Sequence, residues 1–233
     1  MTGEPPPPPD FDGLAGVYRI LEFLAFGGDL QRARTRFADR LSRCRDILVL
    51  GEGDGRYLAQ LVRAAPDASI RCVDASKAML VRAAARLAAA GGGERVTFER
   101  ADAFSLHLPP ERYDAVVTLF FLDCFPPGRV AALVELLLPS LRAGALWAWA
   151  DFAIPARGWA RLRARAWLAL LYAFFRWRTG LAASALPPAE EILLGAGFRR
   201  EASAEFQRGL VRSALFSLRS PPVSGSVATP GKG

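Results

Sequence analysis

The fold is decided by residues 47–57, which read ILVLGEGDGRY. The apolar run at 47–50 is typical of a strand buried on both faces, and the glycines after it end the strand in a tight turn. The residues after the turn, YLAQLV at 57–62, predict the start of a helix. Alternate glycines allow positive φ and a close approach of the backbone to a ligand. A strand, a glycine turn and a helix N-terminus in this order indicate a cofactor cradle in an open α/β sheet.

Two aspartates follow at the ends of the next two predicted strands. Asp74 ends the strand 69–74, roughly 20 residues after Gly55, which is the spacing of a ribose-binding acid in such sheets. Asp102 ends the strand predicted at 96–102. The dinucleotide fingerprint would need a glycine where Arg56 stands, so an NAD-type dehydrogenase is a remote alternative.

Together, the glycine triplet and the two aspartates resemble the class I S-adenosylmethionine-dependent methyltransferases. The similarity is to the small-molecule type that includes the quinone C-methyltransferases, and it runs from about Ile47 to Leu218. It implies S-adenosylmethionine as the cofactor, with the methionyl part at the glycine turn, the ribose hydroxyls at Asp74 and the adenine amino group at Asp102. The cofactor contacts that it implies in this chain are Gly51, Glu52, Gly53, Gly55, Asp74, Ala75, Met79, Asp102, Ala103 and Leu119.

One position departs from the family pattern. The family usually carries an acid two places before the first glycine, and this chain has Val49 there. Glu52 and Asp54 lie inside the turn, and we interpret them as the source of the missing negative charge toward the methionine ammonium.

The rest of the chain predicts one α/β domain. Of the 233 residues, 52% are apolar and 23% charged, which is typical of a globular protein. We expect a Rossmann-like, mostly parallel seven-stranded sheet with helices on both faces and a C-terminal antiparallel hairpin at 198–206 and 211–218. This domain, at 11–219, is expected between a disordered Pro-rich tail at 1–10 and a disordered tail at 220–233.

The charge and the cysteine and histidine content argue against several classes of protein and site. The net charge of +7 is almost all arginine, and no nucleic-acid motif accompanies it, so we expect a solvated surface and no nucleic-acid partner. Three scattered cysteines and one histidine argue against a disulfide framework, a metal site and a Ser–His triad. They fit a reduced cytoplasm, where we expect the protein to act.

The acceptor site is expected after the fourth strand, in residues 118–125, TLFFLDCF. The resemblance places this stretch opposite the transferred methyl group, with Phe120 facing the acceptor. Asp123 stands where many small-molecule relatives carry histidine, so it is the catalytic candidate, a general base whose pKa burial would raise. The equal alternative is that Asp123 caps the helix predicted from Pro126.

The most distinctive segment is 155–186. Its apolar centre between Arg165 and Arg176 is too short to span a bilayer, which takes roughly 20 residues. We interpret 155–186 as a helical lid over the acceptor, with Trp167 and Tyr172 facing it. Contact with an anionic membrane surface is the competing interpretation. Tyr18, before the first strand, is a second lid candidate, because the resembled family covers its cofactor there.

The function that these features predict is methyl transfer from S-adenosylmethionine to a small, partly apolar molecule. The amide-methylating signature of Asn or Asp, two prolines and an aromatic residue is absent from the chain, which disfavours nucleobase and protein-amide acceptors. The alternative is a non-catalytic S-adenosylmethionine-binding or membrane-surface interaction module.

Overall fold

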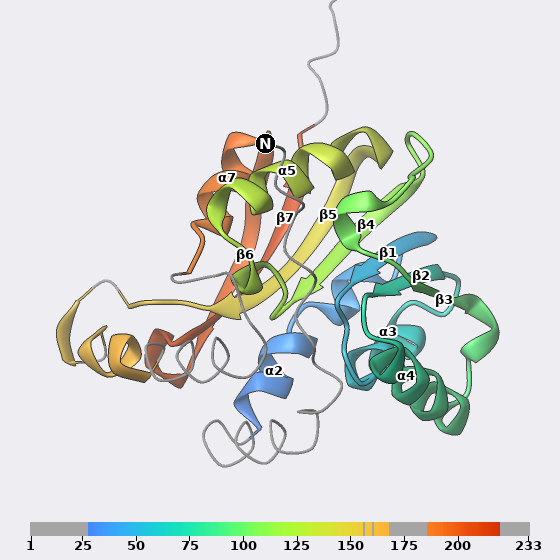
Figure 1. Cartoon of the computed structure of the whole chain (residues 1–233), viewed down its shortest axis with the longest axis horizontal. Helices are drawn as coiled ribbons and strands as arrows, with labels where there is room; N and C mark the ends of the chain where they lie inside the picture. The colour runs from blue at the N-terminus through green and yellow to red at the C-terminus, as the bar shows by residue number, and fades with distance from the viewer. Residues whose placement is uncertain (1–27, 156, 160, 168–185, 220–233) are drawn as a thin grey trace, which may run out of the picture.

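The computed structural model describes residues 28–155, 157–159, 161–167 and 186–219. These residues form one seven-stranded sheet in the order β3-β2-β1-β4-β5-β7-β6 (Figure 1). β1 to β5 are parallel, and β7 lies antiparallel between β5 and β6. The predicted fold class is therefore confirmed. The strands are β1 (Asp46–Leu50), β2 (Ser69–Asp74), β3 (Val96–Arg100), β4 (Tyr113–Leu119), β5 (Leu141–Phe152), β6 (Phe198–Phe206) and β7 (Val211–Leu218).

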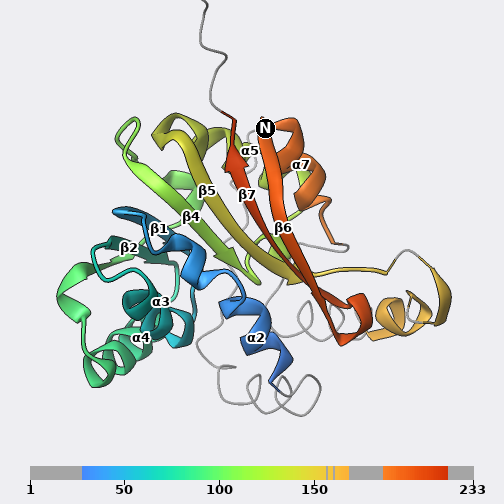
Figure 2. The same cartoon turned by 180° about the vertical axis from the view of Figure 1, so that it is seen from behind.

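Helices cover both faces of the sheet, as Figures 1 and 2 show from opposite sides. α3 (Arg56–Ala64), α4 (Lys77–Ala90) and the 3-10 helix Ala38–Leu41 cover one face, and α5 (Pro127–Leu137) and α7 (Ala189–Gly195) cover the other. Along β1, Ile47 and Val49 pack toward α3 and α4, whereas Leu48 and Leu50 pack toward α5 and α7. Burial on both faces explains the continuous apolar run of β1.

The helix predicted before the first strand differs from the sequence expectation. In the sequence, Leu30, Ala33, Phe37 and Leu41 have helical spacing after Gly28, which predicts one helix capped by Asp29. In the structure, α2 (Asp29–Thr35) follows Gly28 without a side-chain cap, and residues 38–41 form a separate 3-10 turn. The Asp29 carboxylate instead binds the side chains of Arg32 and Gln207. The prediction of Asp29 as a cap was therefore wrong, because a contact distant in sequence takes its carboxylate.

α2 lies where β5 ends and the antiparallel β7 begins (Figure 1). Its Leu30 and Ala33 are buried against Phe152 and Val211. The hydroxyl of Ser213 donates to the carbonyl of Ala33 at 2.8 Å. α2 is thus fixed over the edge of the sheet from which the parallel strands exit.

Most of the other elements begin and end at or near the residues that the sequence predicts. The sequence predicts a helix at 77–90 with Ser76 as its N-cap. Ser76 does cap α4, accepting the Met79 N–H at 3.1 Å. The third strand, predicted to reach Asp102, ends at Arg100, because Asp102 turns to cap the 3-10 helix Ala103–Ser105. The hairpin strands have the predicted bounds.

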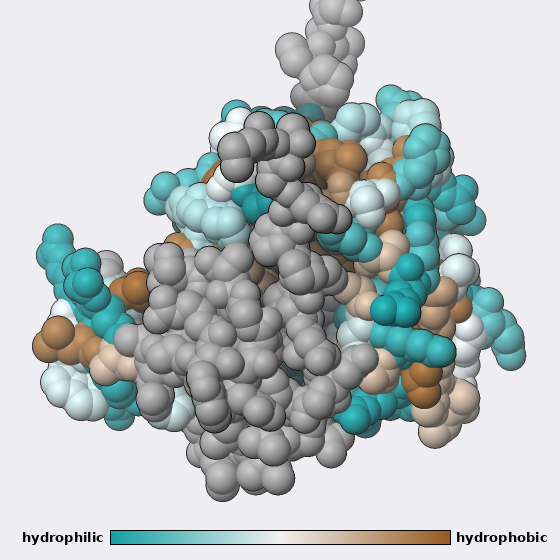
Figure 3. All heavy atoms as spheres, in the orientation of Figure 1, coloured by the Kyte–Doolittle hydropathy of each residue, from teal (hydrophilic) through white to brown (hydrophobic). Residues whose placement is uncertain are grey.

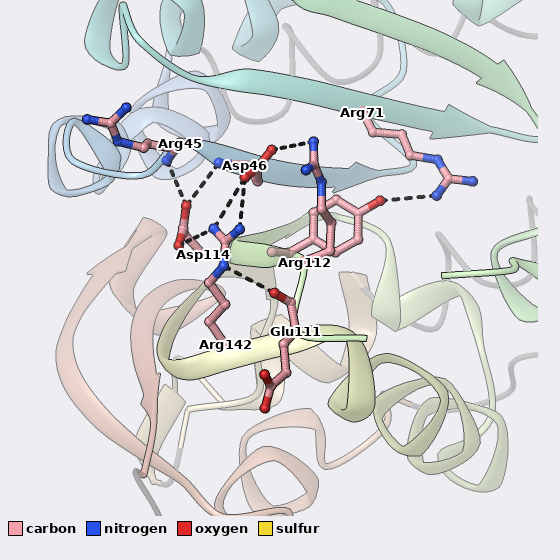
Figure 4. Close-up of polar contacts among 8 residues, drawn as sticks. Arg45, Asp46, Arg71, Glu111, Arg112, Asp114 and Arg142 are labelled. Atoms are coloured by element: carbon pink, nitrogen blue, oxygen red, sulfur yellow. Dashed lines mark hydrogen bonds and ion pairs between the residues drawn. The ribbon is translucent and has the colours of Figure 1, made fainter. Parts of the chain in front are cut away.

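A polar network joins three strands at the opposite, amino edge of the sheet (Figure 4). Asp114 of β4 accepts the backbone N–H groups of Arg45 and Asp46 at 2.8 and 3.0 Å. Arg142 of β5 donates to Asp114 at 2.8 Å and to Asp46 of β1 at 3.2 Å. Arg112 also pairs with Asp46, at 2.8 Å. This edge is closed by ion pairs, while the carboxyl edge carries the glycine turn.

Within the described ranges, no helix is both long and apolar enough to cross a membrane. The tails predicted at 1–10 and 220–233 lie outside those ranges, as do residues 168–185, most of the segment predicted to form a lid.

Candidate active site

The glycine turn connects β1 to α3 at the carboxyl edge. Gly51, Gly53 and Gly55 have φ values of 63°, 77° and 86°, a region that side chains other than glycine rarely adopt. The N–H of Gly51 donates to the carbonyl of Val73 at 2.9 Å, which ties the turn to β2.

The three glycines meet different surroundings. A Cβ at Gly55 would lie 2.6 Å from the Cα of Ala83 in α4, and a Cβ at Gly51 would lie 2.1 Å from Cδ2 of Phe121. A Cβ at Gly53 would have no atom within 4 Å. The outer two glycines therefore serve the packing of the protein itself, whereas the middle one leaves open space in front of the backbone.

Asp74 joins the turn to the start of α4. Its carboxylate accepts the N–H of Gly53 at 3.3 Å and the N–H of Ser76 at 2.8 Å. The structure thus brings together the glycine turn and the predicted ribose-binding acid. Met79, in the first turn of α4, is half-buried, and Ala75 is exposed.

Asp102 lies one strand further along the same edge. It is exposed at the end of β3, and its carboxylate accepts the N–H of Phe104 at 3.1 Å. Ala103 beside it is buried. The two predicted cofactor acids, Asp74 and Asp102, therefore follow neighbouring parallel strands, as expected.

The two acids inside the turn have other partners than we expected. The carboxylate of Glu52 accepts the N–H groups of Gly55, Tyr57 and Leu58 at 2.5, 2.8 and 3.2 Å, so it caps the N-terminus of α3. Asp54 pairs with Arg56 and Arg86, each at 3.2 Å. Both carboxylates therefore have partners within the protein, and their contact with the methionine ammonium stays a prediction.

Burial has a clear effect on Glu52. It raises the pKa of this carboxyl to about 7, although hydrogen bonds from three backbone amides act in the opposite direction.

The loop after β4 closes over the turn. Leu119 is buried at the end of β4, and Phe120 adopts a φ of 54°, with its N–H donating to the carbonyl of Ala150 at 2.6 Å. The N–H of Phe121 donates to Asp151 at 3.1 Å, and the Phe121 ring lies against Gly51. An aromatic wall therefore stands beside the first glycine, in the stretch that we expect to face the transferred methyl group.

Asp123 and Asp151 form a buried pair of carboxyl groups. Their residues are 8% and 2% exposed. Asp123 accepts the thiol of Cys124 at 3.6 Å and the N–H of Phe152, while the indole N–H of Trp149 donates to Asp151. Burial raises the pKa of Asp123 to about 6, and burial and the neighbouring Asp123 charge raise the pKa of Asp151 well above its usual value.

The capping interpretation of Asp123 was wrong. α5 begins at Pro127 after Pro126 without a side-chain cap, because the Asp123 carboxylate is used within the buried pair. Sequence reasoning also missed Asp151. The signal that could have found it is a single aspartate within the otherwise apolar run WAWADF, at 147–152. Such a run predicts a buried strand, in which a carboxylate is unusual.

The lid candidates are only partly described. Trp167 and Phe120 pack against the same apolar cluster, which includes Phe152 and Ala164. Tyr18 and Tyr172 lie outside the described residues. Over the described ranges, no group of three or more His, Cys, Asp or Glu side chains could hold a metal ion.

Comparisons with known proteins relate the chain to methyltransferases. Residues 47–144 match the family model described as a methyltransferase domain. A release factor glutamine methyltransferase of Gloeobacter violaceus is 34% identical over 96 residues, covering 41% of this chain and 31% of that protein. The chain thus spans about a third of the length of this curated relative.

Solved structures share the fold across most of the chain. The mitomycin 7-O-methyltransferase MmcR has a TM-score of 0.64 at 17% identity, covering 88% of this chain and 60% of that one. The N-methyltransferase NodS from Bradyrhizobium japonicum has a TM-score of 0.58 at 17% identity, covering 82% of this chain and 97% of that one. The fold is that of the class I methyltransferases, residues 47–144 match the methyltransferase-domain model, and S-adenosylmethionine is the cofactor that such a domain implies. The class I methyltransferase fold recognised from the sequence is confirmed, and the likeness to the quinone C-methyltransferases stays a prediction.

Proposed function

We propose that this protein transfers the methyl group of S-adenosylmethionine to a small, partly apolar acceptor. The observation that carries the proposal is the bond between the Gly53 N–H and Asp74 at the carboxyl edge. The turn follows β1 and the Phe120–Asp123 loop follows β4, and the strand order changes direction between these two neighbours. Ligands of open α/β sheets bind at such a switch point.

The residues at this edge fit the proposed cofactor. The open space before Gly53 admits a group close to the backbone, which a side chain there would fill. A carboxylate has about four lone-pair positions, so Asp74 can accept ribose hydroxyls while it holds two backbone amides. Asp102 offers an exposed acceptor for the adenine amino group.

The chain positions the two reactants, excludes water from them and supplies a proton acceptor. When bound, S-adenosylmethionine supplies an electrophilic methyl group. Holding two reactants in line can contribute roughly 7–11 kcal/mol to the reaction. The aromatic wall of Phe120 and Phe121 excludes water from the place of transfer and favours an apolar acceptor. Asp123, with a pKa of about 6, is ionised near neutral pH and can take the proton of a hydroxyl or an acidic carbon.

Calorimetric titration tests the proposal. We expect micromolar binding of S-adenosylmethionine and S-adenosylhomocysteine and none of NAD. Asp74→Ala should weaken binding of both adenosyl compounds by about tenfold to a hundredfold, because a hydrogen bond to a charged group is worth about 1.5–3 kcal/mol. Asp74→Asn, which keeps one acceptor, should lie between wild type and Asp74→Ala.

Asp67→Ala is the matched control, since Asp67 is exposed before β2, at the opposite edge. Its affinity should equal that of the wild type, and circular dichroism should show that all variants are folded. Unchanged affinity in a folded Asp74→Ala protein would contradict the ribose site. Absence of adenosyl binding in the wild type would contradict the proposed function itself.

A further inference from the structure

A short helical segment follows β5, and one side of it packs against the β6–β7 hairpin. Residues 158, 159 and 161–167 are helical, and they lie at one end of the molecule, beyond the hairpin tip of β6 and β7 (Figure 1). Ala164 is 1% exposed and packs in a cluster with Leu210. The guanidinium of Arg163 donates to the carbonyl of Gln207 at 2.9 Å. One side of the segment is therefore held on the hairpin.

The outer side of the segment is apolar. Trp159 is 66% exposed, Leu162 is 69% exposed, and Ile154 just before the segment is 43% exposed. Trp159 and Leu162 are three positions apart, so they share one face of the helix. Figure 3 shows hydrophobic atoms bordered by hydrophilic ones at this end of the molecule. Large apolar side chains clustered on a surface mark an interaction site more often than isolated ones do.

The surroundings of this apolar side are strongly basic. Residues 153–188 contain six arginines and no Asp or Glu, whereas the rest of the chain has 24 of the 30 basic residues against 23 acidic ones. Nearly all of the net charge of +7 therefore comes from this stretch. Arg157 and Arg165 are both exposed beside the apolar residues.

We propose that the face formed by Ile154, Arg157, Trp159, Leu162 and Arg165, here the 154–165 face, docks on the surface of an anionic lipid bilayer. Tryptophan and leucine flanked by arginine are the composition of a helix that lies in the membrane interface, with the apolar side chains at the acyl boundary and the arginines at the headgroups. The exposed aliphatic side chains favour lipid over a nucleic-acid phosphate chain, which would offer them no apolar partner.

The position of the face links it to the site. The segment leaves β5 at the carboxyl edge, the same edge that carries the glycine turn. Docking would bring that edge near the lipid, which suits a partly apolar acceptor. This link depends on the proposed function, but the docking itself does not, and its test uses no activity.

Co-sedimentation of the purified full chain with vesicles tests the proposal. The probes are vesicles of phosphatidylcholine alone and vesicles mixed with phosphatidylglycerol. We expect binding to the anionic vesicles, weakened by salt, and little to the neutral ones. The double variant Trp159→Ala, Leu162→Ala should lose at least tenfold in binding. Arg157→Gln, Arg165→Gln should lose about fivefold for each arginine removed.

Matched controls carry the same changes elsewhere on the surface. Val81→Ala removes another exposed apolar side chain, at 60% exposure on α4, and Arg43→Gln, Arg82→Gln lowers the net charge equally at exposed positions. Both control proteins should bind as the wild type does. All the replaced side chains are exposed, so circular dichroism should show every variant folded.

Three results would overturn the proposal. One is absence of binding to anionic vesicles. Another is equal loss of binding in the control variants, which would mean a general charge effect. The third is self-association in sedimentation velocity that Trp159→Ala, Leu162→Ala abolishes, which would assign the face to a second copy of the chain. Loss of adenosyl binding without loss of vesicle binding would overturn only the proposed function.

Discussion

At the residue scale, the three glycines of the turn have different structural roles. All three glycines have positive φ, but only Gly53 faces open space. Gly51 makes room for the Phe121 ring, and Gly55 makes room for the backbone of α4 at Ala83. The repeat in the sequence is regular, yet the reasons for it are three different contacts.

This division predicts different effects of alanine at the three positions. Gly53→Ala should cost about 1–2 kcal/mol of unfolding free energy, the cost of a left-handed residue. Gly51→Ala and Gly55→Ala should cost about 1–3 kcal/mol more because of overpacking, with Gly55→Ala the larger because its neighbour is backbone. Denaturant unfolding measures all three.

Gly53→Ala should nevertheless weaken adenosyl binding strongly, since its methyl group enters the open space. A Gly53→Ala protein that binds like wild type would place the cofactor elsewhere.

At the element scale, Glu52 determines how α3 begins. No serine, threonine, aspartate or asparagine caps this helix from the usual place, because Gly55 occupies it with φ of 86°. Glu52 reaches from three residues earlier to hold the first amides of the helix. The helix that points at the glycine turn thus depends on a buried carboxyl group with a raised pKa.

The raised pKa predicts a pH dependence of stability with a definite sign. Between pH 4.5, the ordinary pKa, and about 7, the folded state binds more protons at Glu52 than the unfolded state. The contribution of Glu52 to stability therefore falls as pH rises through this window. Glu52→Gln removes this contribution, so its stability relative to wild type should rise by on the order of 1–3 kcal/mol from pH 4.5 to 8.

Denaturant titrations at several pH values measure the effect. Glu94→Gln, at an exposed position before β3, is the control and should keep the wild-type slope. The difference between variant and wild type isolates Glu52, because Asp123 and Asp151 remain in both proteins. A difference that does not change with pH would contradict the assignment.

At the scale of the whole molecule, the two edges of the sheet differ in chemistry. Asp46, Asp114 and Arg142 tie β1, β4 and β5 together at the amino edge. The carboxyl edge has buried carboxyl groups and aromatic rings instead. Ion pairs thus fasten the strands at one edge, and the other carries the proposed binding site.

The amino-edge network predicts acid sensitivity. Burial alone would raise the pKa of Asp114, but hydrogen bonds from Arg142 and from two backbone amides outweigh this and hold it below 3.8. The contribution of Asp114 is therefore present above pH 3.8 and is lost as pH falls through the lower folded-state pKa. Asp114→Asn should lose about 1 kcal/mol at neutral pH, allowing for solvent screening.

The loss in Asp114→Asn should shrink in more acidic solution, as thermal unfolding across pH can show. Asp39→Asn, at an exposed position, should change stability by less than about 0.5 kcal/mol. A loss in Asp114→Asn that persists unchanged at low pH would mean that packing, not charge, is responsible.

The sequence by itself determined the succession of strands and helices, the glycine turn, the Ser76 cap and the C-terminal hairpin. These features are local, because apolar periodicity, turn residues and caps act over a few neighbouring positions. The positions of Asp74 and Asp102 at one edge also followed, since parallel strands end on the same side. The sequence therefore predicted the fold and the common edge of the two aspartates that we propose as cofactor ligands.

Only the tertiary structure decided which groups meet across strands. The contact of Phe121 with Gly51 and the pairing of Asp123 with Asp151 depend on β4 lying between β1 and β5. The direction of the Glu52 carboxylate depends on its burial beneath the turn. Side-chain direction and charge state are set by neighbours distant in the chain, and no local pattern encodes them.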